Sequence, residues 1–338
     1  MTLPGPLRAL VARLIADYWV GDARRRQEIG HLLDRTSGKG LVKEFLAQVQ
    51  FRLGVEKAWV SPRAVRFEVT NRCNLKCVMC PQPETMRRPK DHLDFGLYRR
   101  FLDANPGVEE VDLFNWGEPL LHPRILDFVS EASSRGLYTR LVTNAVLLDE
   151  RRAEGLIRAG LREILFSFDG VGEDFERIRG IPIDRPLANV KGFLEARRRL
   201  GARVRTGINI TQSRWNRGLV EAAAAELTAL GVDAVIVQPS EDYSPEYRRR
   251  VPCFEPYRYA VVLSDARVVP CCVDFDGELE FGTIAEEVNL RRLYNGPRIR
   301  SLRRSLRSPD TMTTLCSRCT FKIPAAERPP DPASRPAG

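Results

Sequence analysis

The sequence predicts an α/β protein, either an open partial (β/α)6 barrel or a doubly wound sheet, followed by a small cysteine-bearing α+β module. Two observations favour this class. Short apolar segments alternate with helical patterns, at residues 64–70, 111–116, 137–143, 163–168, 203–210 and 233–238. After about residue 246 this alternation stops. Strands that alternate with helices pair in parallel through right-handed crossovers, so ligands should gather at the carboxyl ends of the strands.

The elements between and after these strands follow from their residue spacing. The apolar residues from Leu187 to Leu200 recur at the interval of one buried helix face. The stretch VVLSDARVVP predicts a β-hairpin with its turn at Ser264 to Ala266, and a basic helical region should follow over 284–306. The predicted division is an N-terminal helical extension (1–60), a core (61–245), the small module (246–325) and a disordered tail (326–338).

Composition places the chain among globular proteins and excludes several classes. Its 338 residues are 43% hydrophobic and 29% charged, with a formal net charge of +9. The arginines at 197–199 and 303–307 are predicted to lie on solvated helix faces, and no aromatic residues interleave with them, so nucleic-acid binding is not expected. The first 26 residues predict an amphipathic helix, and no segment is long enough for a transmembrane helix.

Eight cysteines without a secretory signal indicate a reducing compartment, and hence a cytoplasmic protein. Cys73, Cys77 and Cys80 form C-x3-C-x2-C directly after the first strand. Three thiolates on one loop can bind three irons of a [4Fe-4S] cluster and leave the fourth iron open, which makes it reactive. The alternative is a zinc site of three cysteines completed by His92.

The motif CNLKCVMC at the end of a first strand resembles the signature of the radical S-adenosylmethionine (SAM) superfamily, and the resemblance extends over about residues 61–325. It implies that SAM chelates the open iron, and that an electron delivered by a donor such as flavodoxin or ferredoxin splits SAM. The resulting 5′-deoxyadenosyl radical would abstract a substrate hydrogen. Met79 stands where the family usually has an aromatic residue, which puts the adenine contact there in doubt.

The same resemblance implies a set of SAM contacts at successive strand ends. NWGEP is similar to the element that accepts the SAM amino group, with Trp116 in place of the family's first glycine. Arg179 resembles the arginine that pairs with the SAM carboxylate, a task suited to a guanidinium. The implied SAM-site residues are Met79, Gly117, Glu118, Thr143, Asn144, Ser167, Asp169, Arg179 and Asn209. Each of these short motifs is also ordinary turn or cap chemistry when taken alone.

The downstream cysteines resemble the SPASM/twitch extension of radical SAM enzymes, with VVPCC, FGTI and LCSRC as matching segments. With only five cysteines available, the resemblance implies the twitch form with one auxiliary [4Fe-4S] cluster. Its ligands would be Cys253, Cys271, Cys316 and Cys319. Cys272 is then left to return a hydrogen atom to a substrate radical, or simply to pack as a small apolar residue. Asp274 is a further candidate, as a substrate-side base.

These residues predict a radical SAM oxidoreductase with two [4Fe-4S] clusters. The expected reaction is dehydrogenation or epimerisation of a sugar or aminocyclitol, and modification of a ribosomally made peptide is the alternative. Two hypotheses of other classes remain open, an iron-sulfur electron carrier and a zinc-stabilised interaction protein. Glu118 and Arg179 count against the electron carrier, since such a protein needs no SAM contacts.

Overall fold

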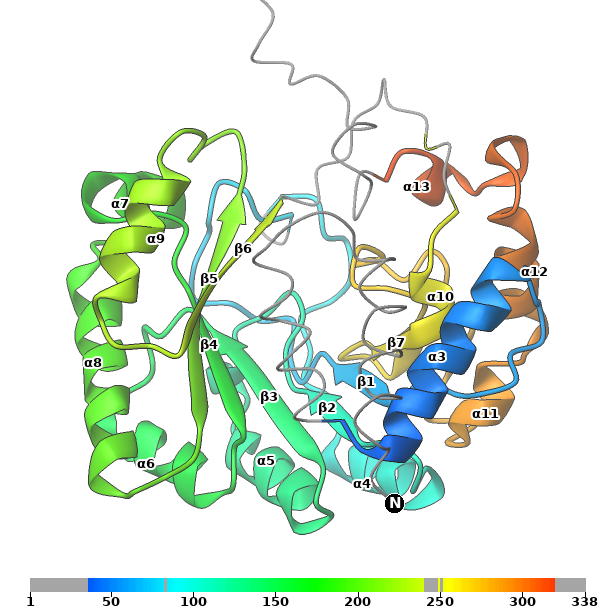
Figure 1. The fold of residues 1–338 in the computed structure, drawn as a ribbon, viewed down its shortest axis with the longest axis horizontal. Helices are drawn as coiled ribbons and strands as arrows, with labels where there is room; N and C mark the ends of the chain where they lie inside the picture. Colours follow the sequence, from blue (N-terminus) through cyan, green and yellow to red (C-terminus); the bar gives the residue numbers. More distant parts are fainter. Residues whose placement is uncertain (1–35, 82–83, 240–248, 250–251, 320–338) are drawn as a thin grey trace, which may run out of the picture.

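A computed structural model describes residues 36–81, 84–239, 249 and 252–319. The amphipathic helix predicted for the first 26 residues and the predicted tail lie outside these residues. Six parallel strands form the core: β1 (Ala64–Phe67), β2 (Glu110–Asp112), β3 (Tyr138–Thr143), β4 (Glu163–Ser167), β5 (Arg205–Gln212) and β6 (Ala234–Pro239). They lie in chain order, and the sheet stays open (Figure 1). The partial barrel predicted from the sequence is confirmed.

Helices connect the strands: α4 (Phe95–Ala104), α5 (Ile125–Ser134), α6 (Glu150–Arg158), α7 (Gly172–Arg179), α8 (Asp184–Arg199) and α9 (Val220–Thr228). Several begin at a side-chain cap. The carboxylates of Asp94 and Asp149 accept backbone N–H groups from Leu97 and Arg152, at 2.8 Å in both cases. Each cap satisfies a donor that the first helical turn leaves without a partner.

The helices cover one face of the sheet and bury its apolar side chains (Figure 1). Phe67 on β1 packs its ring edge-on against Tyr98 and Phe101 of α4, with ring centroids 4.9 and 5.3 Å apart. Tyr98 in turn contacts Phe128 of α5 at 4.6 Å. These large aromatic side chains are fully buried and anchor the helix layer to the strands.

The opposite face of the sheet carries a row of alternating charges, which we call the charge row. Its members stand in register on five neighbouring strands: Arg66, Asp112, Arg140, Glu163 and Arg205. Arg140 Nε lies 2.7 Å from Asp112 Oδ1, and Arg205 pairs with Glu163. Successive residues of a strand point to opposite faces, so the row faces away from the helix layer.

Three further strands extend the same sheet, and short helices accompany them. These elements are α10 (Glu255–Arg258), β7 (Tyr259–Val262), β8 (Arg267–Val269), β9 (Gly282–Thr283), α11 (Leu290–Leu293), α12 (Pro297–Ser305) and α13 (Thr314–Ser317), while α3 (Gly38–Arg52) precedes the core. β7 pairs in parallel with β1 and forms the predicted hairpin with β8. The hairpin therefore continues the core sheet, and the predicted division of the chain into a core and a small module stays a prediction.

One arginine in this region corrects an expectation. Arg303 on α12 is completely buried, although its segment was predicted to be a solvated face. Its guanidinium donates to the carbonyls of Glu56, Pro256 and Tyr294 at 2.9 to 3.0 Å, and it lies 4.3 Å from the Tyr294 ring centroid. It therefore joins the segment after α3 to α10 and α12. None of the helices in the described ranges is long and apolar enough to cross a membrane.

Candidate active site

The three-cysteine loop leaves the carboxyl end of β1 and packs against the end of α7. Cys80 N–H donates to the Cys77 carbonyl at 3.0 Å, and Val78 N–H donates to the Ile178 carbonyl at 3.1 Å. Burial raises the pKa of the Cys73 thiol to about 11, and burial also raises the pKa of Cys77. Buried thiols of this kind become thiolates when a cation supplies the opposing charge.

The residues near the cysteine loop bear on the choice between a [4Fe-4S] cluster and zinc. Among the described residues, no three Cys, His, Asp or Glu side chains converge closely enough to hold a single metal ion. His92 packs its ring against His122, with centroids 5.0 Å apart, and its Nδ1 is buried without a hydrogen bond. Three thiolates from one loop supply the ligands of a [4Fe-4S] cluster with one iron left open, whereas the zinc alternative needs His92, whose ring contacts His122.

Glu118 lies at the centre of the strand ends that were predicted to hold SAM. Its side chain is 2% exposed and accepts three hydrogen bonds: from Thr143 Oγ1 at 2.7 Å, Asn144 N at 2.8 Å and Leu120 N at 3.1 Å. Burial raises the pKa of this carboxyl. A carboxylate offers about four acceptor positions, so one position remains for a further donor such as an ammonium.

Gly117 brings the second strand end against the first. A Cβ atom at this position would lie 2.1 Å from the Thr70 carbonyl oxygen and 2.8 Å from that of Arg72. Glu118 N–H donates to the Arg72 carbonyl at 2.8 Å. The backbone at this glycine therefore approaches the backbone of the cysteine loop closely, while its contact with SAM stays a prediction.

Asn144 and Arg179 connect other strand ends to the cysteines. Asn144 Nδ2 lies 4.0 Å from Cys73 Sγ, and Arg179 Nη1 lies 3.8 Å from Cys77 Sγ. Arg179 also pairs with Asp169, with Nη2 and Oδ2 2.5 Å apart, while its Nε is buried without a hydrogen bond. A buried guanidinium N–H without a partner is what an incoming carboxylate would satisfy.

The remaining predicted SAM-site residues are less constrained. Asn209 and Ser167 are register partners on β5 and β4. Asn209 is buried, whereas Ser167 and Met79 are half-buried. Their contacts with SAM stay predictions.

The downstream cysteines also come together. The pKa of Cys271 is raised first by burial and then by the nearby thiols of Cys272, Cys319, Cys253 and Cys316. Burial likewise raises the pKa of Cys316 to about 11. All five downstream thiols therefore lie near enough to interact electrostatically, and the choice of Cys271 over Cys272 as a cluster ligand stays a prediction. This cysteine-rich environment fits a second cluster.

Cys272 and Asp274 have contacts that bear on their proposed catalytic roles. The Cys272 carbonyl accepts the Trp116 indole N–H at 2.6 Å, so this residue lies beside the motif that contains Gly117 and Glu118. Asp274 is 1% exposed, and its two oxygens accept the backbone N–H groups of Glu278 and Leu279 at 2.8 Å. The Asp274 carboxylate therefore stabilises its own loop, and its use as a base stays untested.

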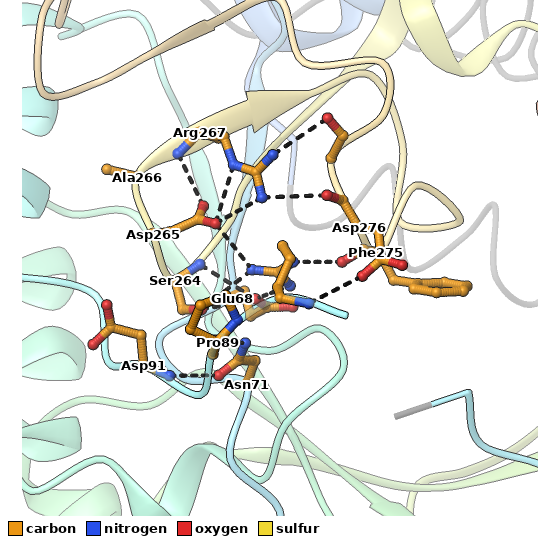
Figure 2. Close-up of polar contacts among 12 residues, drawn as sticks. Glu68, Asn71, Pro89, Asp91, Ser264, Asp265, Ala266, Arg267, Phe275 and Asp276 are labelled. Carbon is orange, nitrogen blue, oxygen red and sulfur yellow. Dashed lines mark hydrogen bonds and ion pairs between the residues drawn. The ribbon is translucent and has the colours of Figure 1, made fainter. Parts of the chain in front are cut away.

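Sequence reasoning missed a buried ion pair next to these sites. Glu68, directly after β1, is fully buried and lies 2.6 Å from Arg88 Nη2. Figure 2 shows Glu68 beside Ser264, whose N–H and hydroxyl both donate to it at 3.2 and 3.1 Å. The available signal was a single acidic residue at the end of an apolar strand.

Comparisons with known proteins agree with this arrangement. The Radical SAM superfamily model matches residues 67–212, and the model of the iron-sulfur cluster-binding domain called SPASM matches residues 253–320. A PqqA peptide cyclase from Gluconobacter oxydans is 29% identical over 77% of this chain and 83% of its own length. A PqqA peptide cyclase from Bradyrhizobium diazoefficiens is 38% identical, over 35% of this chain and only 32% of its own length.

Solved structures share the fold. Streptococcus suis SuiB bound to its precursor peptide SuiA gives a TM-score of 0.60 at 16% identity, over 82% of this chain and 72% of SuiB. BtrN in complex with AdoMet and 2-DOIA gives 0.53 at 17% identity, over 77% of this chain and 94% of BtrN. The two matched domains imply [4Fe-4S] clusters and SAM. This chain therefore belongs to the radical SAM superfamily and carries an iron-sulfur SPASM domain after its core.

Proposed function

We propose that this protein is a radical SAM enzyme that modifies a peptide. The observation that carries the substrate class is the likeness to a PqqA peptide cyclase, which runs through 77% of the chain. The fold of SuiB, solved with a precursor peptide, supports the same class. This places the peptide ahead of the sugar or aminocyclitol that the sequence alone favoured.

The residues of the chain have distinct tasks in this proposal. Cys73, Cys77 and Cys80 would hold the cluster, which together with SAM supplies a 5′-deoxyadenosyl radical that abstracts hydrogen from the substrate. Glu118 retains one acceptor position for the SAM ammonium. Arg179 retains its buried Nε for the SAM carboxylate.

A second candidate is oxidation or epimerisation of a small polyhydroxylated molecule. Two observations favour it. The chain matches 94% of BtrN but 72% of SuiB. Five downstream cysteines supply thiolates for one complete four-cysteine cluster. Cys272, beside the SAM motif, would be the hydrogen donor if the reaction is an epimerisation.

A substrate panel separates the two candidates. The anaerobically reconstituted protein is incubated with SAM, a reductant and either short peptides or aminocyclitols and sugars, and 5′-deoxyadenosine is measured. A peptide should raise its yield, and deuterium from that peptide should appear in 5′-deoxyadenosine. Stimulation by an aminocyclitol alone would favour the second candidate, and no SAM cleavage under any condition would contradict both.

Cysteine variants test the assignment of the two clusters. Replacement of Cys73, Cys77 and Cys80 together by Ala should abolish 5′-deoxyadenosine formation, because SAM loses its iron. Cys316→Ala should spare SAM cleavage but block product formation. The wild type should hold about eight irons per chain, as two cubane clusters require. Equal loss of SAM cleavage in both variants would show that the two sites are misassigned.

A further inference from the structure

The Glu68–Arg88 ion pair lies where the two cysteine-bearing segments meet. Glu68 precedes the first cysteine loop, and Arg88 lies in the loop that follows Cys80. Both side chains are buried, at 0% and 6% exposure, and Nη2 of Arg88 lies 2.6 Å from Oε1 of Glu68. The buried ion pair therefore connects the segments on either side of the SAM-cluster loop.

The Glu68 carboxylate reaches two other segments. Its Oε1 accepts the N–H and the hydroxyl of Ser264, in the β7–β8 turn. Its Oε2 accepts Asn115 Nδ2 at 3.0 Å, from the loop after β2. One carboxylate thus holds the hairpin turn against the end of the core strands (Figure 2).

Arg88 reaches the segment just after Cys271 and Cys272. Its Nε donates to the Phe275 carbonyl at 2.5 Å, and its Nη1 lies 3.6 Å from Asp265 Oδ2. The backbone N–H groups of Arg87 and Arg88 donate to Asp276 Oδ1 at 2.8 and 3.4 Å. Figure 2 shows Phe275 and Asp276 side by side, across the network from Asn71 and Asp91.

Trp116 contacts the same segment from the second strand end. Its indole N–H donates to the Cys272 carbonyl at 2.6 Å, and its ring meets that of Phe275 edge-on, with centroids 5.8 Å apart. The 272–276 segment is therefore held by Arg88 and by Trp116, and both come from the SAM-binding part of the chain.

We propose that Arg88 is a positioning residue that fixes the auxiliary-cysteine segment relative to the SAM-cluster loop. Apolar residues of similar volume would often stabilise a buried site as well as an ion pair does, but they lack directed hydrogen bonds. The planar guanidinium of Arg88 contacts three partners at once and so fixes their relative positions: Glu68, Asp265 and the Phe275 carbonyl. The inference rests on the proposed function in that both cysteine sets are taken to hold clusters.

The test compares Arg88→Gln with Arg87→Gln in the reconstituted holoenzyme. Arg87 is the matched control, because it is exposed and only its backbone N–H enters the network. In Arg88→Gln, amide hydrogens of residues 264–279 should exchange faster by on the order of tenfold. The magnetic interaction between the two reduced clusters, seen as line broadening and fast relaxation in electron paramagnetic resonance, should change. Arg87→Gln should match the wild type in both measurements.

Two further variants keep the test decisive. Arg88→Lys can keep the ion pair with Glu68 but cannot also reach Phe275, so it should retain iron and SAM cleavage while the magnetic interaction still changes. If Arg88→Gln does not fold, Asp276→Ala removes the acceptor of two backbone N–H groups without leaving a buried charge, and should show faster exchange in 264–279.

Unchanged exchange and unchanged resonance in the folded variants would overturn the positioning role, as would equal effects from Arg87→Gln. A wild type that binds only about four irons would contradict the second cluster of the proposed function. In that case the exchange measurement alone still decides whether Arg88 holds the segment.

Discussion

At the scale of single residues, the site depends on how closely backbone segments approach. Gly117 lies in the motif that resembles the element accepting the SAM amino group, and the atoms that crowd it are carbonyls of the cysteine loop. The glycine thus joins the part of the chain that would bind the SAM ammonium to the part that would bind the cluster. Glycine is required at this position for a steric reason, because the Cβ of any other residue would overlap backbone carbonyl groups.

The first prediction concerns this approach. Gly117→Ala should lower the free energy of unfolding by about 2 to 3 kcal/mol, because its Cβ overlaps the Thr70 carbonyl. Gly192→Ala on α8 is the control: apart from the backbone of its own helix, no atom would lie within 4 Å of its Cβ. Ala is also the better helix former, so this variant should be more stable by about 0.5 to 1 kcal/mol. Urea unfolding measures both. Equal stability of the two variants would rule out the steric explanation.

The second prediction concerns the buried thiols. In metal-free protein the pKa of Cys73 and of Cys316 is raised to about 11, chiefly by burial. Their thiolate fractions at pH 7 are therefore very small, and alkylation by iodoacetamide should accelerate about tenfold per pH unit from pH 7 to 10. Mass spectrometry after timed quenching gives the rates. Fast labelling at pH 7 that hardly changes with pH would contradict the raised values.

At the scale of elements, the charge row accounts for the charged residues within strands that are otherwise apolar. Each strand from β1 to β5 places at least one charged residue on the face opposite the helices, and register brings opposite charges side by side. Asp112 is completely buried and contacts Arg66, Arg140 and the hydroxyl of Tyr259. The row therefore acts as a polar connection between strands that share a face.

The third prediction follows from this row. Asp112→Ala should destabilise by about 3 to 5 kcal/mol, because it leaves two cations without their shared carboxylate. Glu195→Ala is the control: its pair with Arg198 is exposed, at 57% and 76%, and should change stability by no more than about 0.5 kcal/mol. Thermal unfolding of both variants provides the comparison. A loss below about 1 kcal/mol for Asp112→Ala would mean that the row contributes little.

At the scale of the whole molecule, the sheet joins the two cysteine-bearing parts. β7 adds to the edge of β1, and β8 and β9 extend the sheet further. The ion pair of Glu68 and Arg88 then fixes the two parts beside each other. The predicted boundary near residue 245 lies among residues outside the described ranges and stays a prediction.

The fourth prediction tests whether the core is independent. A chain that ends after Pro239 exposes the β1 edge and leaves the Glu68 carboxylate without Ser264. An unpaired edge strand promotes association, so this fragment should aggregate or unfold without cooperativity. Co-expression of residues 246–338 should give a 1:1 complex of the two fragments that unfolds cooperatively, as judged by size-exclusion chromatography and circular dichroism. A monomeric fragment that unfolds cooperatively would show that the core folds alone.

Several features of the fold and site could be predicted from the sequence because they depend on local patterns. Apolar runs such as 163–168 predicted all six core strands, and the hairpin turn at Ser264 to Ala266 was also predicted correctly. The cysteine spacing predicted the metal chemistry that the family matches support. These features involve residues close in sequence, so their spacing is enough to indicate them.

Other features were decided only by the tertiary structure. Three features depend on residues that are far apart in the chain. They are the pairing of β7 with β1, the burial of Arg303 and the contact of Arg88 with Phe275. From the sequence alone, a charged residue is predicted to be exposed to solvent. Whether a carbonyl, an aromatic ring or a carboxylate lies beside it depends on the tertiary structure. The sequence by itself thus determined the six core strands and the cysteines that are candidate cluster ligands, whereas the connection between the two cysteine-bearing segments was decided by long-range packing, which residue spacing does not encode.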